Sequence, residues 1–595
     1  MTSKSPVAAL RAKLAEEGLD GYVVPRFDEH QGEYCAAHDN RLAHVTGFTG
    51  SAGVAIVMRD RAAIFVDGRY QVQVRAEIDE GIFAIQHFYD APLKDWLRTN
   101  LRPGERVGFN AMLLPSTWDA DCGASVKAAG AHWVSVTDDL VDAIWVDQPE
   151  RPLGKITAFP LARSGETVAE KKRRIAAALA DEGADFLVET QPDNIAWFLN
   201  VRGSDVAFNP MPQSFLILDR SGTAEWLVDH RKLPNDLSDF ELQGVAMAEP
   251  KSLLERVRNA APERTLLLDP AFAPSAVAHA ARIAGGRVRL NRSPVTLAKM
   301  VKNPAELAGF RDCHKFDGAA WIRFFAWLEK HGATRAASGR PITELEAEER
   351  ILAFRQMAGD FVEPSFRTIS ASAGNAAMCH YAASTASNAP ITEKGVYLLD
   401  SGGQYLSGTT DATRTTALAP VSDEIRQRYT AVLKGFISMM ALKFPAGTCG
   451  HHLDAFARRP LWDLGLDYDH GTGHGVGHFL SVHELPQRFD RRINEIVLTP
   501  GMVTTIEPGY YKAGEYGIRI ENQVEVVSEP DGFLRFRTLT LIPIDLRLAD
   551  LGALTGAECR WLDAYHAEVA AAMGGLLDGE AAAWLAARTA SILDL

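Results

Sequence analysis

The stretch VYLLDSGGQYLSGTTDATRTTAL (residues 396–418) predicts two strands that run past each other and bring two acids together. An apolar run ends at Asp400, a Gly-Gly pair follows, and Asp411 lies on the returning strand. Because a hairpin places its strands side by side, two acids at these positions can meet on one face. Carboxylates that lie so close repel each other, so we expect a positive charge between them.

A second stretch, VTTIEPGYYKAGEYGIRIENQVEVV (residues 503–527), predicts the same arrangement. Glu507 ends a strand at a Pro-Gly pair, and Glu521 lies on the return strand. Alternation along that strand places Arg519 on the same face as Glu521, where we expect it to orient that carboxylate. A single acid beside a hairpin is more often a solvated turn residue, but chance does not readily place four acids on two hairpins of one design.

The glycine-rich stretch HGTGHGVGHF (residues 470–479) adds histidines to these acids. Its glycines make a helix unfavourable, so an extended or looped backbone is expected. In an extended chain His470, His474 and His478 share one face, and the bare glycine face lets another backbone or a ligand approach closely. Taken alone, the stretch fits a binding site and a buried, hydrogen-bonded bend equally well.

The kinds of side chain in these segments indicate which metal they could hold. Four acids and one histidine form an oxygen-rich set that suits two hard or borderline divalent cations better than one tetrahedral zinc ion. The six cysteines of the chain are scattered without a CxxC pair, so they predict neither a disulfide framework nor a thiolate zinc site.

Composition narrows the class of protein. The chain has 595 residues and a formal net charge of -14, which argues against nucleic-acid binding because phosphate contacts need a basic surface. No apolar run approaches the length of a membrane span. The N-terminal stretch MTSKSPVAALRAKLAEEG (residues 1–18) becomes charged where a signal peptide needs an apolar core. We therefore expect a soluble cytoplasmic protein.

The first three hundred residues contain one α/β pattern twice, which predicts two related domains. Three segments recur in the same order, namely LAEEGLDGYVV (14–24) as LADEGADFLVE (179–189), DNRLAHVTGF (39–48) as DNIAWFLNVRG (193–203), and IFVDGR (64–69) as WLVDHR (226–231). A Pro-rich connector, DQPERPLGK (147–155), separates the copies, and Asn303-Pro304 predicts the start of a long helix. We expect domains at 1–150, 151–300 and 301–595.

The catalytic segments resemble the signature blocks of the pita-bread metallopeptidases, specifically the aminopeptidase P (Xaa-Pro aminopeptidase) family. The matching blocks are LLDSGGQYLSGTTDATRT, HGTGHGVGHFLSVHE, TTIEPGYY and GIRIEN, in the expected order. TGFTGSAG (46–53) and VDGRY (66–70) resemble the N-terminal domains of the long, three-domain form, and LTGAECRWLDAYHAEV (554–569) resembles its tail. The resemblance implies two creatinase-like α/β domains, then an α+β pita-bread catalytic domain with a C-terminal extension over about 550–595.

Carried over residue by residue, the resemblance implies a dinuclear site, usually of manganese, although Zn²⁺ or Co²⁺ would also fit. Its five ligands would be Asp400, Asp411, His474, Glu507 and Glu521. The substrate-side residues would be His380, His470, His483 and Arg519, with His380, His483 and Glu507 as the catalytic residues. Ser407, where relatives often have an acid, and Leu485, where glycine is common, depart from the pattern, and Leu485 leaves the shape of the pocket beside His483 open.

The expected activity is that of a metallo-aminopeptidase. A hydroxide that bridges two metal ions would attack the bond between the first residue and a proline in second position, and Glu507 would move the proton. The partners would be such peptides and, by resemblance, a second copy of the chain in a homodimer. Two alternatives are a prolidase, which cleaves only dipeptides and which the doubled N-terminal domain disfavours, and a pita-bread binding module that has lost catalysis.

Overall fold

The computed structural model describes residues 5–392 and 394–593, and the chain divides into two compact units, Met1–Lys299 and Met300–Leu595. The first four residues of the N-terminal stretch considered above lie outside the described residues. Within the described ranges, no helix combines the length and the apolar character that a membrane crossing requires. Both units mix helices and strands, which confirms the predicted α/β class.

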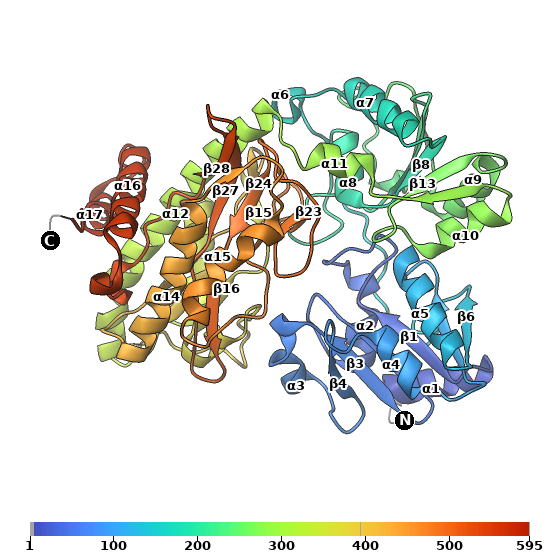
Figure 1. The fold of residues 1–595 in the computed structure, drawn as a ribbon, viewed down its shortest axis with the longest axis horizontal. Helices are drawn as coiled ribbons and strands as arrows, with labels where there is room; N and C mark the ends of the chain where they lie inside the picture. The colour runs from blue at the N-terminus through green and yellow to red at the C-terminus, as the bar shows by residue number, and fades with distance from the viewer. Residues whose placement is uncertain (1–4, 393, 594–595) are drawn as a thin grey trace. The chain divides into compact units, whose positions relative to one another are not determined.

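The first unit contains two mixed sheets of the same topology (Figure 1). From edge to edge, the strand order of the first sheet is β4-β3-β2-β1-β5-β6. Its strands are β1 (Gly21–Pro25), β2 (Val54–Met58), β3 (Ala62–Val66), β4 (Ala84–His87), β5 (Arg106–Asn110) and β6 (His132–Val136). The second runs β12-β11-β10-β8-β13-β14, formed by β8 (Phe186–Glu189), β10 (Phe215–Asp219), β11 (Ala224–Leu227), β12 (Val245–Ala248), β13 (Thr265–Leu268) and β14 (Arg287–Leu290).

The two sheets also agree in the sense of their strand pairs. Strand β1 runs antiparallel to β2 and parallel to β5, and β8 runs antiparallel to β10 and parallel to β13 in the same way. The outer pairs β3 with β4 and β11 with β12 are parallel in both. The doubled unit that the sequence echoes predict is therefore confirmed.

The first helix of this unit buries one apolar stripe. The helix α1 (Pro6–Glu16) begins with Ser5 as its cap and buries Val7, Leu10 and Leu14, which lie on one face at helical spacing. The others are α2 (Arg41–Thr46), α3 (Gln73–Glu77), α4 (Leu93–Asn100), α5 (Ser116–Ala128), α6 (Leu161–Ser164), α7 (Val168–Asp181), α8 (Pro192–Phe198), α9 (Leu253–Ala260), α10 (Ser275–Ile283) and α11 (Pro294–Lys299). A short strand pair, β7 (Thr157–Ala158) with β9 (Val201–Arg202), completes the unit.

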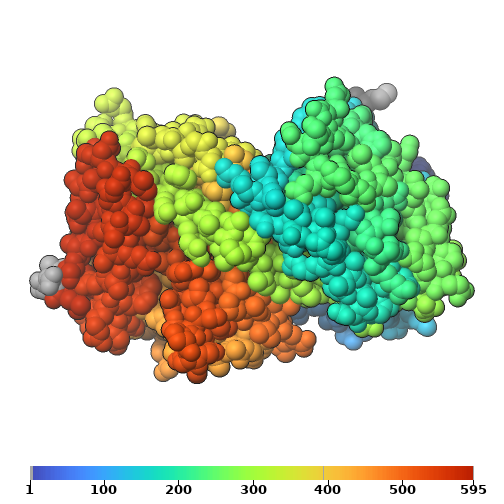
Figure 2. Space-filling view, turned by 90° about the horizontal axis from the view of Figure 1, so that it is seen from above, coloured from blue at the N-terminus to red at the C-terminus, as the bar shows by residue number. Residues whose placement is uncertain are grey.

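The second unit begins with the long helix that the Asn-Pro pair predicts. The helix α12 (Pro304–Ala337) starts directly after Asn303, whose side-chain oxygen accepts hydrogen bonds from the amides of Ala305 and Glu306. The Glu306 carboxylate in turn accepts a hydrogen bond from the Asn303 amide, which completes a capping box. The C-terminal helices α16 (Gly556–Met573) and α17 (Gly579–Arg588) pack against α12, as Figures 1 and 2 show.

The strands of the second unit form three main sheets and one hairpin. Their members are β15 (Phe361–Pro364), β18 (Gly403–Tyr405) and β19 (Gly408–Thr409) in one sheet, and β16 (Ile369–Ser372), β17 (Tyr397–Asp400) and β20 (Thr413–Thr416) in the next. The third runs β21 (Lys443–Pro445), β28 (Phe533–Thr538), β27 (Asn522–Ser528), β24 (Val503–Ile506), β22 (Gly473–Gly475) and β23 (Glu484–Phe489). The hairpin is β25 (Gly509–Lys512) with β26 (Tyr516–Arg519).

Three further helices enclose the core of this unit. The helices α14 (Asp423–Met440) and α15 (Gly450–Trp462) pack on each other, while α13 (Glu344–Arg355) packs on α12. Phe436 of α14 is fully buried in the largest apolar cluster, which also takes in strand residues such as Ile518 and Val524. These buried strands hold the polar ends described next.

Both predicted acid-bearing hairpins are present, but each is split by a second hairpin. Strand β17 pairs antiparallel with β20, with Asp400 opposite Thr413, and the chain between them forms the β18 and β19 pair. In the same way β24 pairs with β27, with Ile506 opposite Asn522, and the β25 and β26 hairpin lies between. The Gly-Gly pair is therefore not the turn of the first hairpin, because Gly403 already belongs to β18.

Candidate metal centre and active site

The two split hairpins bring the four predicted acids to one place. Asp400 is the last residue of β17, while Asp411 lies between β19 and β20. Glu507 directly follows β24, and Glu521 directly precedes β27. The strand register explains this. Each acid lies at or just beyond the last residue pair between β17 and β20 or between β24 and β27.

The histidine stretch supplies a nitrogen donor to the same place. His474 is the middle residue of β22, and its Nε2 lies 3.5 Å from Asp411 Oδ2 and 3.7 Å from Glu507 Oε1. Its Nδ1 lies 2.8 Å from the carbonyl oxygen of Gly475, so the ring can donate there and leave Nε2 as a metal ligand. His474 therefore lies on an extended strand, as predicted for this stretch, and its ring faces the acids.

The glycines on either side of His474 make room for neighbouring strands. A side chain at Gly473 would begin 2.0 Å from the carbonyl oxygen of Thr505, and one at Gly475 would begin 2.5 Å from that of Glu484. Any other residue would therefore collide with β24 or β23. The predicted close approach of another backbone is confirmed, and it holds the His474 ring against the acids.

The ligand atoms form overlapping groups. In each group every residue offers one nitrogen or carboxylate oxygen that lies within 4.8 Å of those of the others. The groups are Asp400, Asp411 and Glu521; His474, Glu507 and Glu521; and Asp411, His474 and His483. Asp411, His474 and Glu521 each belong to two groups. Such shared donors suit two adjacent divalent cations.

The close packing of the acids raises the pKa values of two of them, Asp411 and Glu521. Burial raises the pKa of Asp411 well above its ordinary range, and the carboxylates of Asp400 and Glu507 raise it further. Burial likewise raises the pKa of Glu521, with added repulsion from Asp411, Asp400 and Glu507. Such a cluster of carboxylates is unfavourable without a cation, because like charges in a buried site oppose ionisation.

The donor set fits a pair of divalent cations on one further observation. Asp400 is buried, and its Oδ1 has no hydrogen-bond partner among the residues that the structure describes. A buried carboxylate oxygen without a partner is costly, and a metal ion would satisfy it. Oxygen donors with one imidazole are the ligands that hard and borderline divalent ions prefer.

Arg519 has a different carboxylate partner from the one expected. Its Nη2 donates to Asp400 Oδ2 at 2.5 Å, while it reaches Glu521 only through the Thr413 hydroxyl. The reason is that the chain leaves β26 at Arg519 and enters another sheet after Glu521, so the two side chains do not continue one alternating strand. Arg519 supplies the positive charge that the first hairpin needs, and it is only 3% exposed.

A tyrosine joins Arg519 to the predicted substrate-side histidine His470. Arg519 Nη1 donates to the Tyr511 hydroxyl at 2.6 Å, and His470 Nε2 lies 2.9 Å from the same oxygen. Burial alone would lower the pKa of Arg519, but Tyr511 and Asp400 raise it well above its ordinary value. The guanidinium therefore stays charged, and its donors are directed to protein groups.

The other histidines lie at different depths. His483 and His474 are in edge contact, with ring centroids 4.4 Å apart, and His380 lies 6.4 Å from His483 in a near-parallel orientation. His483 therefore has both other rings as neighbours, and one of its ring nitrogens belongs to the ligand group of Asp411 and His474. His478, for which no catalytic role is expected, is buried and packs edge-on against Phe310.

Comparison with known proteins covers the whole chain. Residues 308–528 match the metallopeptidase family M24, and 532–592 match its C-terminal region. Residues 6–142 and 147–306 match creatinase/prolidase N-terminal domains. A probable Xaa-Pro aminopeptidase P from Fusarium vanettenii is 37% identical over 620 residues, which cover 99% of both chains. The chain belongs to the aminopeptidase P family of M24 metallopeptidases.

Solved structures agree with the family. X-prolyl aminopeptidase from Caenorhabditis elegans, a cytosolic enzyme with a di-nuclear active site, is 32% identical, superposes with a TM-score of 0.93 and covers 99% of each chain. The Xaa-Pro dipeptidase from Bacillus anthracis shares the fold at 22% identity and a TM-score of 0.51, and it covers 64% of this chain. The predicted fold, with creatinase-like domains before a pita-bread domain, is confirmed.

Sequence reasoning missed three supporting residues in this member of the aminopeptidase P family. The Thr413 hydroxyl donates to Glu521 Oε2 at 2.7 Å, the Gln523 side-chain oxygen accepts the amide of Asp411 at 2.8 Å, and Tyr511 joins Arg519 to His470. Gln523 had a signal, because it lies on the same face of its strand as Glu521. Thr413 had none, since Glu521 lies 108 residues away, and Tyr511 had none because a tyrosine on a hairpin does not by itself indicate a bond to Arg519 or His470.

Proposed function

We propose that the protein is an aminopeptidase that releases the first residue of peptides with proline in second position. The observation that carries this proposal is the overlap of the three ligand groups through Asp411, His474 and Glu521. Membership of the aminopeptidase P family supports the substrate class, because relatives along the full length of the chain carry the name Xaa-Pro aminopeptidase P.

The proposed ligands of two divalent cations are Asp400, Asp411, His474, Glu507 and Glu521. Manganese is the metal we propose, because four carboxylates and one imidazole favour a hard to borderline ion, with Zn²⁺ and Co²⁺ as the competitors. When bound, such a pair supplies a water of lowered pKa and polarises the scissile carbonyl. Arg519 and Thr413 contribute by fixing the carboxylates of Asp400 and Glu521.

Glu507 is the residue we assign to proton transfer. Its carboxylate faces His474 at the junction of the ligand groups, where it can accept the proton of the attacking water and deliver it to the prolyl nitrogen. His483 lies next to His474 and is placed to donate a hydrogen bond to the carbonyl oxygen as negative charge develops there. Both assignments use groups already held in position by neighbouring strands.

His380 and His470 are the proposed substrate-side residues. His380 lies next to His483, with ring centroids 6.4 Å apart, and His470 contacts Tyr511, which also accepts a hydrogen bond from Arg519. We propose that Arg519 acts through Asp400 and Tyr511 without touching the peptide, since it is buried and bonded to both. Selection of proline rests on its ring, which fixes φ and removes the amide hydrogen.

The test of this function is a panel of peptides assayed with and without Mn²⁺. We expect release of the first residue from Xaa-Pro-Yaa peptides, little activity on matched Xaa-Ala-Yaa peptides, and loss of turnover after chelation. Cleavage of Gly-Pro alone, with no action on longer peptides, would indicate a prolidase. A protein that binds the metals and cleaves none of these peptides would indicate a binding module.

Three broader assignments accompany this function. We propose a working division into domains at 1–150, 151–300 and 301–595, with the C-terminal extension from about 550, and the matched ranges ending at 142 and 306 support it. We also propose a cytoplasmic homodimer. The cytosolic Caenorhabditis elegans relative supports the compartment. Fractionation of cells and analytical ultracentrifugation test the compartment and the oligomeric state.

A further inference from the structure

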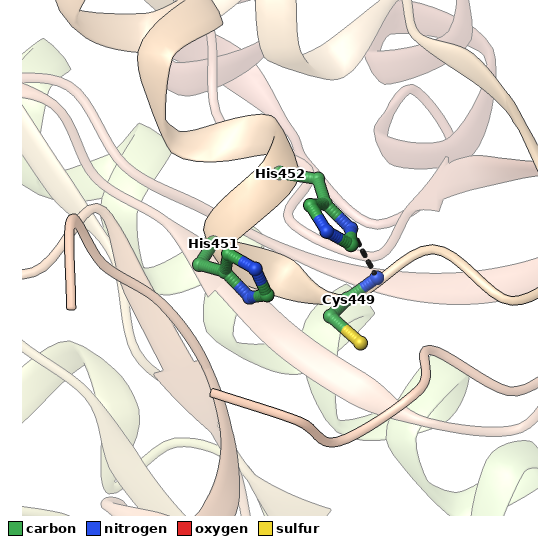
Figure 3. Close-up of side chains that lie close together, drawn as sticks. All are labelled: Cys449, His451 and His452. Carbon is green, nitrogen blue, oxygen red and sulfur yellow. Dashed lines mark hydrogen bonds between the residues drawn. The ribbon is translucent and has the colours of Figure 1, made fainter. Parts of the chain in front are cut away.

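A second group of metal-binding side chains lies at the start of helix α15, outside the acid site. Cys449 precedes the helix, and His451 and His452 are in its first turn. Each offers one sulfur or ring nitrogen within 4.8 Å of those of the other two. Figure 3 shows the two imidazoles and the cysteine side chain gathered where the chain enters the helix. None of the three is among the proposed ligands of the two-metal site.

The His451 ring is already oriented as metal-binding histidines usually are. Its Nδ1 lies 2.9 Å from the carbonyl oxygen of Asn494, to which it can donate, while the Asn494 amide nitrogen lies farther away, at 3.4 Å from the same Nδ1. A histidine that donates one ring nitrogen to a carbonyl presents the other as a ligand, and this contact fixes both the tautomer and the ring plane. His451 is half-buried, so the ring is confined by its surroundings and open to solvent at once.

Cys449 is buried, whereas the His452 ring is exposed. The backbone of Cys449 pairs with Val497, so the sulfur is carried by a fixed segment.

The separations are compatible with one ion after a small closure. Zinc binds sulfur at about 2.3 Å and nitrogen at about 2.0 Å, so its tetrahedral ligands lie about 3.3 to 3.6 Å apart. The ligand atoms here lie within 4.8 Å before any ion is present. The His452 ring is exposed, but to turn toward the sulfur it must give up the hydrogen bond that its Nδ1 accepts from the Cys449 amide at 3.1 Å.

We propose that Cys449, His451 and His452 bind one ion of the zinc class, separate from the two-metal site. One thiolate and two imidazoles are soft and borderline donors, which favour Zn²⁺ or Co²⁺ over Mn²⁺. The ion would strengthen the link between the first turn of α15 and the segment 494–497. These two parts already contact each other through His451 with Asn494 and through Cys449 with Val497. The spacing of the cysteines does not predict this site, because the site contains only one cysteine.

The experiment uses Co²⁺ as the probe, because a cysteine thiolate bound to cobalt gives a near-ultraviolet charge-transfer band. None of the five proposed ligands of the two-metal site is a cysteine, so the band reports a bound thiolate, and its loss in Cys449→Ser assigns that thiolate to Cys449. We expect the full-length protein titrated with Co²⁺ to show the band. Cys449→Ser should abolish it while the visible cobalt bands of the oxygen-rich site remain. Serine is a preferred N-cap, so the variant keeps the helix start.

Cys559→Ser provides the matched control, since Cys559 is half-exposed in α16 and should leave the band unchanged. His451→Gln should weaken the band and raise the cobalt concentration that it requires. Absence of the band in the unmodified protein, or its persistence in Cys449→Ser, would overturn the proposal. Neither result depends on peptide cleavage, so failure here is distinguishable from failure of the proposed aminopeptidase function.

Discussion

The Thr413 hydroxyl donates a hydrogen bond to the Glu521 carboxylate at 2.7 Å and so ties the first split hairpin to the second. A backbone bond from the Glu521 amide to the Thr413 carbonyl, 3.1 Å long, runs beside it. Glu521 is shared by two of the ligand groups, so its orientation affects both. The contact between these residues therefore links the geometry of the entire site.

Replacing Thr413 by valine tests that link, since valine keeps the shape and removes the hydroxyl. We expect Thr413→Val to lower metal affinity by about 10- to 100-fold, as loss of a bond to a metal ligand usually does. Thr413→Ser retains the hydroxyl and should stay close to the unmodified protein. The measurement is activity as a function of Mn²⁺ concentration. Equal metal dependence in the valine and serine variants would show that the bond has no role.

The ion pair between Lys302 and Glu484 should matter for stability. Both side chains are almost fully buried, at 1% and 0% exposure, and Glu484 directly follows His483. Lys302→Met leaves a buried carboxylate without its cation, so we expect a loss of about 3 to 5 kcal/mol in the free energy of unfolding. Urea unfolding measures it, and adding Glu484→Gln should restore part of the loss.

The exposed pair of Lys315 with Asp312 is the control for that prediction. Its atoms are 3.0 Å apart, but its side chains are 48% and 59% exposed. Lys315→Met should change stability by less than about 1 kcal/mol, because water screens such pairs. If both lysine variants unfold at the same urea concentration, the buried pair contributes no more to the free energy of unfolding than the exposed pair does.

His566 should make stability fall in acid. The side chain is 1% exposed, and its Nε2 accepts the amide of Ile544 at 3.1 Å, so the ring is neutral in the folded protein. Burial, followed by the charge of Arg414 and opposed by Asp563, lowers its pKa to about 4. The unfolded chain has the ordinary value of about 6.5. Stability is therefore complete above that value and is lost as the pH falls toward 4.

The expected loss is up to about 3 kcal/mol, since each unit of pKa difference is worth about 1.4 kcal/mol. His566→Gln keeps an acceptor for the amide but cannot titrate. We expect its thermal midpoint to depend less on pH than that of the unmodified protein between about pH 7 and pH 4. Parallel curves for the two proteins would contradict the assignment, whatever their difference at neutral pH.

Much of the fold was readable because its signals are local. The doubled unit showed itself in repeated short segments, and Asn303 with Pro304 marked the start of α12. The inserted hairpins were not foreseen. Gly402-Gly403 looked like a turn, but the turn-like composition there reflects close packing, since a side chain at Gly402 would begin 1.8 Å from the Thr410 carbonyl. Local composition cannot distinguish these causes.

The pairing of the acids was predictable because it depends only on how a hairpin returns. Placing Asp400 with Asp411, and Glu507 with Glu521, needed only the expectation that a strand returns beside its predecessor. The partner of Arg519 was wrong because it depends on a change of sheet between Arg519 and Glu521. Pairings such as Thr413 with Glu521 join segments 108 residues apart, and the sequence of either segment contains no trace of the other.

The most direct test of the account is a Mn²⁺ titration of the metal-free protein, with bound metal and Xaa-Pro-Yaa cleavage measured on the same samples. We expect activity to return as two ions bind per chain, and Asp411→Ala and Glu521→Ala to lose metal and activity together. Cleavage at the full rate by metal-free protein, or full activity in either variant, would contradict the claim that these five side chains hold the ions that drive the reaction.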